Sequence, residues 1–188
     1  MNLLIEHFRK FVSIASSEEE DILSYFELIK VPKKTFLLKK GEICDSSFFI
    51  TEGCVKFYSL DNSGVEHIIL FGPENWWITD MYSLLSEIPS DLFIESILAT
   101  SYYQITRKKQ LQLLENFPKL EKHFRILLEN HTISNHKRIR QNMELTAKER
   151  YEIFCNRYPS LIQTIPQKLI ASYLGVTPEF LSKLRGMY

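Results

Sequence analysis

The stretch from Gln167 to Leu184 reads QKLIASYLGVTPEFLSKL, and it decides the architecture of the C-terminal part of the chain. Gly175 supplies the positive φ that a tight turn between two helices requires. Thr177 and Pro178 then restart a helix, because Thr is a favoured N-cap residue and Pro is favoured at the first helical position. The stretch therefore predicts two short helices joined by a tight turn.

Apolar side chains in this stretch recur where two crossing helices bury their contacts. Ala171 is small at a point where the helices must approach closely, and Thr164 with Gln167 predicts a capping box at the start of the first helix. The remaining contact positions are apolar, namely Ile170, Leu174, Val176, Leu181 and Leu184. Together with a glycine four positions after Ala171, this set predicts a helix-turn-helix.

The second helix of a helix-turn-helix enters the major groove of DNA with its N-terminal residues at the base edges. Glu179 can accept a hydrogen bond from cytosine N4, Lys183 can donate to guanine O6 and N7, and Phe180 can contact a thymine methyl group. Thr177 and Lys168 are candidates for phosphate contacts, which position a protein without specifying sequence. The predicted DNA-binding set is Lys168, Thr177, Pro178, Glu179, Phe180, Ser182, Lys183 and Arg185.

The charge of the chain is divided between its two ends. The 23 basic and 23 acidic residues give a formal net charge of zero. Residues 1–115 hold 11 Lys/Arg and 17 Asp/Glu, whereas residues 116–188 hold 12 Lys/Arg and 6 Asp/Glu. A protein that binds a polyanion with one end is expected to carry an excess of basic residues at that end, as the C-terminal third does here. A basic face is also often merely solvated, so charge alone leaves both interpretations open.

The middle of the chain has the pattern of short β-strands separated by turns. Apolar, β-branched or aromatic runs are bounded by turn signals such as Gly41, Gly53 and Gly72-Pro73. The expected strands cover residues 35–38, 47–51, 54–60, 67–71, 93–98 and 102–106. Strands this short at intervals of about ten residues predict a small antiparallel barrel or roll. A short helix at residues 18–26 is expected before it.

A long amphipathic helix is expected after the β region, running to about Gln141. Its apolar stripe recurs at three- and four-residue spacing, and consists of Phe117, Leu120, Phe124, Leu127 and His131. The stripe can pack on the β-roll, or pair with its twin in a two-fold dimer. We expect three parts: a sensor β-roll at 1–115, a dimerisation helix at 116–142 and a DNA-binding domain at 143–188.

Composition places the chain among folded proteins and excludes several other classes. With 45% hydrophobic and 24% charged residues, it can bury a substantial core. No apolar stretch approaches the ~18 residues of a membrane span, and the first ten residues lack the apolar run of a signal peptide. We therefore expect a cytoplasmic protein without a membrane partner. Its three cysteines are scattered and form no metal-binding motif.

Taken together, the glycine-bounded strands, the long helix and the segment IASYLG at residues 170–175 resemble the Crp/Fnr family of bacterial transcription regulators. The resemblance covers nearly the whole chain. It implies an α+β fold: an N-terminal antiparallel β-roll like a cyclic nucleotide-binding domain, a long dimerisation helix and a C-terminal helix-turn-helix. Because residues 159–165 are short for a wing hairpin and the chain stops soon after Leu184, we expect a trimmed winged-helix domain.

The same resemblance leads to an expectation about the small-molecule effector that the β-roll would bind. Family members that bind cyclic AMP use a Gly-Glu pair for the ribose and, ten residues beyond that Glu, an Arg-Ser pair for the phosphate. Here Thr79-Asp80 and Ser90-Asp91 fall at those places. Without the arginine the phosphate loses its bidentate partner, and Asp91 adds a like charge. We therefore expect cyclic AMP to bind weakly or not at all.

No other cofactor is predicted for the sensor. Trp76, Trp77 and Tyr82 are candidates for stacking on an uncharged or aromatic ligand, or else they fill a ligand-free core. The full set of candidate effector-pocket residues is Trp76, Trp77, Thr79, Asp80, Tyr82, Ser90 and Asp91. The family's iron–sulfur sensors need four cysteines, and His67 with Cys54 forms no recognisable haem pair.

Two functions remain in competition, and an enzyme is not expected. The first is a homodimeric transcription regulator on palindromic duplex DNA, with RNA polymerase as a further candidate partner. The second is a small-molecule-binding β-roll whose C-terminal helices contact proteins. The chain has no nucleophile with its base, no HExxH motif and no phosphate-binding GxxxxGKS loop.

Overall fold

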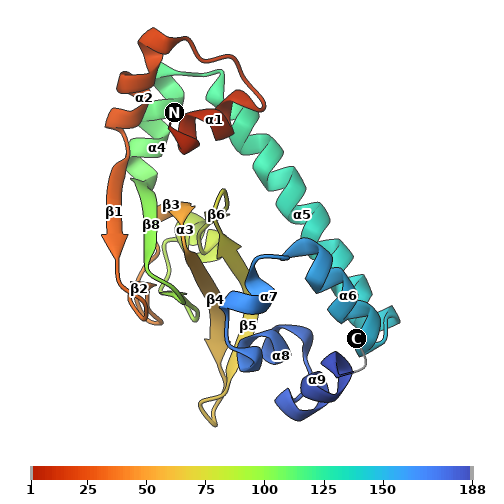
Figure 1. Cartoon of the computed structure of the whole chain (residues 1–188). Helices are drawn as coiled ribbons and strands as arrows, with labels where there is room; N and C mark the ends of the chain where they lie inside the picture. Colours follow the sequence, from red (N-terminus) through yellow and green to blue (C-terminus); the bar gives the residue numbers. More distant parts are fainter. Residues whose placement is uncertain (1, 187–188) are drawn as a thin grey trace. The chain divides into compact units, whose positions relative to one another are not determined.

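The computed structural model describes residues 2–186 of the 188-residue chain (Figure 1). It combines helices with two antiparallel sheets, as the predicted α+β class requires. The chain divides into two compact units. The first comprises Met1–Ser59 with Leu70–Leu127, and the second comprises Leu60–Ile69 with Leu128–Tyr188. The tip of one β-hairpin therefore belongs to the same unit as the C-terminal helices.

Within residues 2–186, eight strands form two four-stranded sheets. The first sheet has the order β1 (Glu27–Val31), β8 (Thr100–Thr106), β3 (Ser46–Glu52), β6 (Trp77–Ile78). The second has the order β2 (Phe36–Leu38), β7 (Phe93–Ser96), β4 (Cys54–Leu60), β5 (Glu66–Pro73). In each sheet a late strand pairs antiparallel with two early ones, β8 with β1 and β3, and β7 with β2 and β4. All six strands expected from the sequence are present, and β1 and β6 are additional.

The two sheets of the roll approach each other closely inside the first unit. A Cβ atom added at Gly72 on β5 would lie 3.0 Å from Val55 Cγ2 on β4 and 3.4 Å from Ile78 Cδ1 on β6. The 3.0 Å contact is with the neighbouring strand of the same sheet, so a larger residue at position 72 would require Val55 to shift, and the 3.4 Å contact shows that β6 of the other sheet packs directly on Gly72. Val55 and Ile78 are buried, as expected for the interior of a packed roll.

A helical layer packs on the first sheet and forms the main core of this unit. It consists of α1 (Leu3–Arg9), the 3₁₀ turn η1 (Ser16–Glu18), α2 (Glu19–Ser24), α4 (Arg107–Asn116) and the beginning of α5 (Leu120–Glu144). Phe8, Ile22 and Leu113 from these helices pack in one cluster with Phe49 and Ile105 from the strands. The helix predicted at 18–26 is shorter than expected, and α1 is not predicted. A further short helix, α3 (Met81–Ser86), follows β6.

The long helix begins later than the sequence stripe suggested. Phe117 ends α4 with φ −129° and ψ 69°, and α5 starts only at Leu120. The reason is Pro118, because the residue before a proline is disfavoured in the α-helical region. From there α5 runs for 25 residues to Glu144, three residues beyond the predicted end.

The second unit is built from short helices. They are α6 (Ala147–Arg157), α7 (Leu161–Thr164), α8 (Gln167–Leu174) and α9 (Pro178–Arg185), together with the later part of α5. The predicted capping box of Thr164 with Gln167 is wrong. Thr164 belongs to α7, and its hydroxyl donates to the Ser160 carbonyl at 2.9 Å, while α8 begins without a side-chain cap. Among the described residues, no helix is long and apolar enough to cross a membrane.

Candidate nucleic-acid interface

The helix-turn-helix predicted from residues 167–184 is present as α8, a tight turn and α9. Gly175 adopts φ 67°, the left-handed conformation that the turn requires. The Thr177 side chain accepts from the Phe180 N–H at 3.2 Å, and Pro178 is the first helical residue. Both local signals read from the sequence are therefore confirmed.

The apolar contacts between α8 and α9 also match the prediction. Ala171 is fully buried, which lets the two short helices approach closely. Four of the five predicted contact residues are buried, namely Ile170, Leu174, Leu181 and Leu184, and Val176 is half-buried. Leu169 is buried as well and was not predicted. This small core fixes the orientation of α9 on α8.

The outward face of α9 carries most of the predicted DNA-binding residues. With 100° per residue, Glu179, Ser182 and Lys183 lie opposite the buried Leu181 and Leu184. All three are exposed, and so are Thr177, Pro178 and, on α8, Lys168. Phe180 flanks this face with 48% of its surface exposed. The exposed side chains of Thr177, Pro178, Glu179, Phe180, Ser182 and Lys183 make up the surface that we call the α9 face.

Arg185 differs from the other predicted DNA-binding residues. It is half-buried and lines a cavity against α6, together with Tyr151, Glu152 and Cys155. A guanidinium in that position is partly removed from the α9 face. The structure thus places Arg185 at the edge of the candidate interface, toward the domain core.

Glu179 is held in its ionised form. Its carboxylate interacts with its own backbone N–H and with the Thr177 side chain, and these contacts lower the pKa of Glu179. The first turn of a helix also favours negative charge. An ionised carboxylate only accepts hydrogen bonds, which suits an amino group such as cytosine N4.

Three side chains that the sequence did not single out anchor α8. The Arg150 guanidinium donates from Nη1 to the Leu145 carbonyl at 2.8 Å and from Nη2 to the Leu174 carbonyl at 3.2 Å. The second bond satisfies a carbonyl at the C-terminal end of α8. Arg138 on α5 stacks its guanidinium on the Tyr173 ring at 4.3 Å. The third anchor is Ser172.

Ser172 joins α8 to the hairpin tip, residues 60–69, within the second unit. Its hydroxyl donates to the Glu66 carbonyl at 2.6 Å and accepts from the Ile68 N–H at 3.0 Å. Arg138 adds a bond from Nη2 to the Ile68 carbonyl at 3.1 Å. Ser172 and Arg138 therefore satisfy three backbone groups along one edge of β5: the Glu66 carbonyl, the Ile68 N–H and the Ile68 carbonyl.

The hairpin turn itself is stiffened by Asp61. Its carboxylate accepts from the backbone N–H groups of Ser63 and Val65 and from the Ser63 hydroxyl, and lies 2.8 Å from His67 Nε2. These bonds lower the pKa of Asp61 far below its usual range, with Ser63 and His67 making the largest contributions. The segment that docks on α8 is thus preorganised.

The pairs Thr79-Asp80 and Ser90-Asp91, which we call the degenerate cassette, are joined by their own hydrogen bonds. The Asp80 carboxylate accepts from the N–H groups of Tyr82 and Ser83 at the start of α3, and from the Ser90 hydroxyl at 2.5 Å. Both Asp80 and Ser90 are buried. Asp91 is exposed, with Lys40 Nζ 3.8 Å from its carboxylate. Two of the candidate effector-binding side chains are therefore already bonded to each other.

The other candidate effector residues lie in different surroundings. Trp77 packs among Phe49, Phe124 and His123, with ring centroids 5.3, 5.5 and 6.4 Å away. Tyr82 is 72% exposed, and the Thr79 hydroxyl donates to the Ser46 carbonyl at 2.9 Å. Trp76 is half-buried and its carbonyl accepts from Ile50 N at 2.9 Å. Trp77 thus occupies the core, the second of the two roles considered for it.

The predicted dimer stripe is divided along the helix. Leu120 is buried in the core of the first unit, and Phe117 and Phe124 pack against that core. Leu127 is half-buried and His131 is exposed. The beginning of the stripe thus packs on the β-roll unit, and the helix exposes other apolar side chains further along, Leu128 and Ile139 among them. Residues 2–186 contain no group of three or more His, Cys, Asp or Glu that could hold a metal ion.

Comparisons of this chain with solved protein structures agree with the fold described above. No protein-family model and no curated protein matches the chain. Among solved structures, the Thermus thermophilus catabolite activator protein is 17% identical with a TM-score of 0.60, covering 93% of this chain and 84% of its own. The c-di-GMP-responsive regulator CLP of Xanthomonas campestris is 11% identical with a TM-score of 0.69, covering 92% and 91%.

A third match carries the family name. A protein of Eubacterium rectale described as a transcriptional regulator of the Crp/Fnr family is 16% identical with a TM-score of 0.68, covering 91% of this chain and 82% of its own. These neighbours are regulators and not enzymes. The resemblance drawn from the sequence is confirmed for the fold over most of the chain.

Proposed function

We propose that this chain, which has the fold of the Crp/Fnr regulators, is a cytoplasmic, sequence-specific DNA-binding transcription regulator. The observation that carries the proposal is the α9 face. It presents an ionised carboxylate, an ammonium group, a hydroxyl and an aromatic ring on one short helix that packs on the anchored α8. These are the groups that read base edges in the major groove.

We further propose that the protein acts as a homodimer on a near-palindromic site. Two copies of α9 would then meet half-sites about 34 Å apart, one turn of the DNA helix. Exposed apolar side chains on α5 support pairing along that helix, because Leu128 and Ile139 are eleven residues apart and face the same side. Contact with RNA polymerase would follow from the same role and is part of the proposal.

The sensor is proposed to work without cyclic AMP. The family's phosphate-binding arginine has no counterpart at Ser90-Asp91, and Asp80 is committed to the N-terminus of α3 and to Ser90. A further carboxylate, Asp91, would repel the cyclic phosphate.

Selection of duplexes from a random pool tests the DNA-binding proposal. Lys183→Ala should relax preference at one base pair per half-site, by about 1–3 kcal/mol of discrimination. Lys168→Ala should weaken binding to all sequences alike, and should reduce the slope of log affinity against log salt concentration by about one per half-site. Lys108→Ala, at an exposed lysine of α4 in the first unit, is the control and should change neither.

Two outcomes would contradict the proposal. One is the absence of any enriched sequence in the selection with the unaltered protein. The other is a Lys183→Ala variant that keeps the full sequence preference, because the α9 face would then not be the reading surface. Binding of proteins but not DNA by residues 128–186 would favour the alternative, a small-molecule-binding roll with protein-binding helices.

A further inference from the structure

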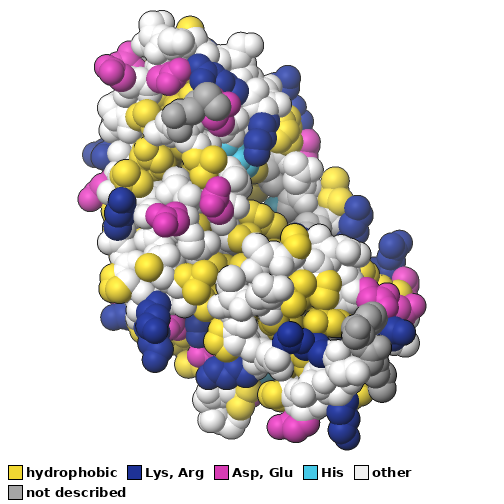
Figure 2. All heavy atoms as spheres, in the orientation of Figure 1, with side chains coloured by type: hydrophobic (Ala, Val, Ile, Leu, Met, Phe, Trp, Pro, Cys, Tyr) yellow, Lys and Arg dark blue, Asp and Glu magenta, His cyan; other side chains and the backbone are white. Residues whose placement is uncertain are grey.

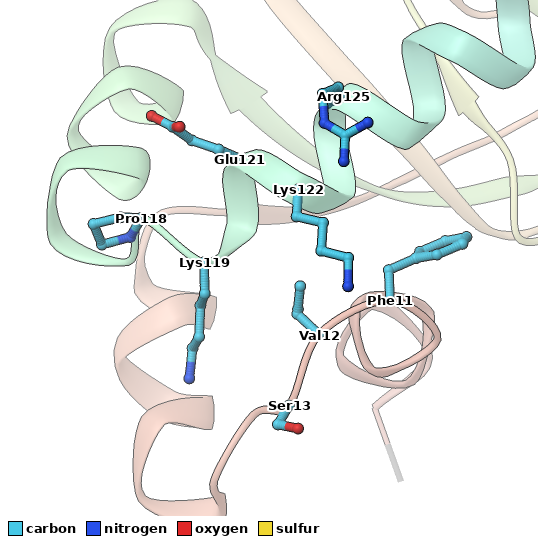
Figure 3. A pocket seen from close by; sticks show the side chains of 8 residues that line it. All are labelled: Phe11, Val12, Ser13, Pro118, Lys119, Glu121, Lys122 and Arg125. Carbon is cyan, nitrogen blue, oxygen red and sulfur yellow. The ribbon is translucent and has the colours of Figure 1, made fainter.

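A cavity of about 720 Å³ lies on the first unit, away from the degenerate cassette. It is formed by the segment that follows α1 and by the beginning of α5 (Figure 3). Its volume is within the range of small-molecule sites, about 300–1,000 Å³. The lining residues are Phe11, Val12, Ser13, Pro118, Lys119, Glu121, Lys122 and Arg125.

The charged side chains of this cavity are arranged asymmetrically. Lys119, Lys122 and Arg125 follow one another at three-residue spacing, which keeps them on one side of the chain as α5 begins. In Figure 3, the Lys122 side chain extends toward Phe11 and Val12, the Arg125 guanidinium lies above Lys122, and the Glu121 carboxylate points away from both. The cavity is therefore lined by two cations, Lys122 and Arg125, and by an acid that is turned outward.

The cations of the cavity differ in the contacts that they already make within the protein. Lys119 Nζ bonds the Glu18 carboxylate at 2.7 Å, so its charge is neutralised locally. Lys122 is exposed and forms no ion pair with any residue in the range 2–186. The first turn of α5 adds the positive end of a 25-residue helix to the same place.

The apolar side of the cavity is held in place by the core behind it. Phe11 and Val12 are half-buried. The Phe11 ring contacts two buried imidazoles, with centroids 5.4 Å from His123 and 6.5 Å from His7. His123 is itself packed edge to face against Phe8 at 4.6 Å. An aromatic surface fixed in this way costs little conformational entropy when a ligand binds.

We propose that this cavity binds a small organic anion with an aromatic or aliphatic body. The acid group lies between Lys122 and Arg125, and the apolar body covers Phe11 and Val12. The ligand class follows from the pairing of cations with a rigid apolar surface. A purely inorganic anion would make no apolar contact with Phe11, and a neutral ligand would form no ion pair with Lys122. The proposal concerns the first unit alone and requires no DNA.

Fluorescence titration of the full chain with 8-anilinonaphthalene-1-sulfonate tests this site. The probe has the required aromatic body and sulfonate group, and N-phenyl-1-naphthylamine supplies the same rings without the charge. Lys122→Gln and Arg125→Gln should each weaken sulfonate binding about tenfold while leaving the neutral probe unchanged. Lys108→Gln and Lys109→Gln, at exposed lysines of α4 outside the cavity, are the matched controls.

Phe11→Ala tests the apolar half of the site and should weaken binding of both probes. If this variant folds poorly, the glutamine variants decide alone, because they alter exposed side chains. Sulfonate affinity in the Lys122→Gln, Arg125→Gln double variant within twofold of the unaltered protein would overturn the proposal. An equal loss in the α4 controls would do so too, because binding would then depend on overall charge. Neither result bears on duplex selection, so this proposal and the DNA-binding proposal fail separately.

Discussion

Two buried histidines, His7 on α1 and His123 on α5, lie with ring centroids 5.2 Å apart inside an aromatic cluster. All four of their ring nitrogens are buried without a hydrogen-bond partner among the described residues. Burial lowers the pKa of His7 to about 4, with Lys10 adding to the effect. It lowers the pKa of His123 to about 3, with further contributions from His7 and Lys10. Both rings are therefore neutral in the folded protein at pH 7.

This pair predicts a loss of stability in mild acid. Between pH 6.5 and about 4 the unfolded chain takes up protons that the folded protein excludes, so stability decreases as pH falls. Each histidine contributes a slope of up to about 1.4 kcal/mol per pH unit. His123→Phe should flatten the pH dependence of urea unfolding between pH 7 and 5. Tryptophan fluorescence reports on the correct unit, because both tryptophans, Trp76 and Trp77, lie in the first unit.

The control for this prediction is His136→Phe, which changes an exposed histidine of α5. That variant should keep the pH dependence of the unaltered protein. The prediction fails if the free energy of unfolding of His123→Phe falls as steeply with acid as that of the unaltered chain.

The cassette residues lead to a prediction about cyclic AMP. Because Asp80 is bonded by Ser90 and caps α3, neither side chain is available to a ribose or phosphate without breaking a buried hydrogen bond. Isothermal calorimetry with cyclic AMP should show no binding stronger than about 1 mM. A micromolar dissociation constant would contradict the prediction and would require the Asp80–Ser90 bond to open.

At the scale of elements, the hairpin tip and α8 form one connected piece. Ser172 satisfies two backbone groups of β5, so Ser172→Ala leaves the Glu66 carbonyl and the Ile68 N–H without that partner. The expected cost is about 1–2 kcal/mol. Hydrogen exchange at the Ile68 amide should accelerate by about tenfold, which corresponds to ~1.4 kcal/mol of local opening.

Ser160→Ala is a matched control for this experiment. Ser160 precedes α7, is exposed, and its side chain makes no capping bond. Exchange at Ile68 should be unchanged in this variant. Equal exchange rates at Ile68 in Ser172→Ala and the unaltered protein would show that the serine does not anchor the hairpin.

Local signals explain which elements could be predicted from the sequence. The turn at Gly175 and the cap at Thr177 depend on neighbouring residues only, and both are confirmed. The role of Ser172 was not predictable, because Glu66 lies 106 residues away along the chain. Helix α1 has only seven residues, too few for a clear periodic pattern. The break before α5 did have a local signal, Pro118, which the apolar stripe obscured.

The residues of the candidate site also divide into those that local sequence signals predict and those whose position depends on tertiary packing. Exposure of Glu179, Ser182 and Lys183 follows from helical periodicity, once α9 is recognised. The position of Arg185 near Tyr151 depends on how α6 packs in the domain and could not be read from spacing. Trp77 is similar, since its ring partners come from distant segments, including Phe49 and Phe124.

For the whole molecule, zero net charge is the sum of two opposite halves. Residues 1–115 carry an excess of acid and residues 116–188 an excess of base, which is compatible with the proposed contact between the C-terminal helices and a polyanion. Figure 2 shows acidic and basic side chains together on one face of the molecule, so the division is one of net charge and not of exclusive sign. Lys119, Lys122 and Arg125 belong to the basic segment by sequence but to the first unit by structure, so the division by sequence and the division into units do not coincide.

Dimerisation is the prediction that involves the whole molecule. Leu128 and Ile139 on α5 are 47% and 59% exposed and lie three turns apart on one side of the helix. Ile133, 51% exposed, faces the opposite side, about 140° away from Leu128 around the helix axis. Burying the first pair against a second copy would remove apolar surface from water, whereas Ile133 would remain in solvent.

Replacing Leu128 and Ile139 together by Glu should therefore convert a dimer to a monomer in sedimentation experiments, because four carboxylates would face one another across the helix pair. Ile133→Glu adds the same kind of charge to the same helix and should leave the dimer intact. On a palindromic duplex the double variant should lose about 100-fold in affinity, because the second half-site no longer benefits from a high effective concentration. Its affinity for a single half-site should match that of the unaltered protein. Dissociation by Ile133→Glu, or an unaltered palindrome affinity in the double variant, would instead place the dimer contact on another surface and separate DNA binding from pairing along α5.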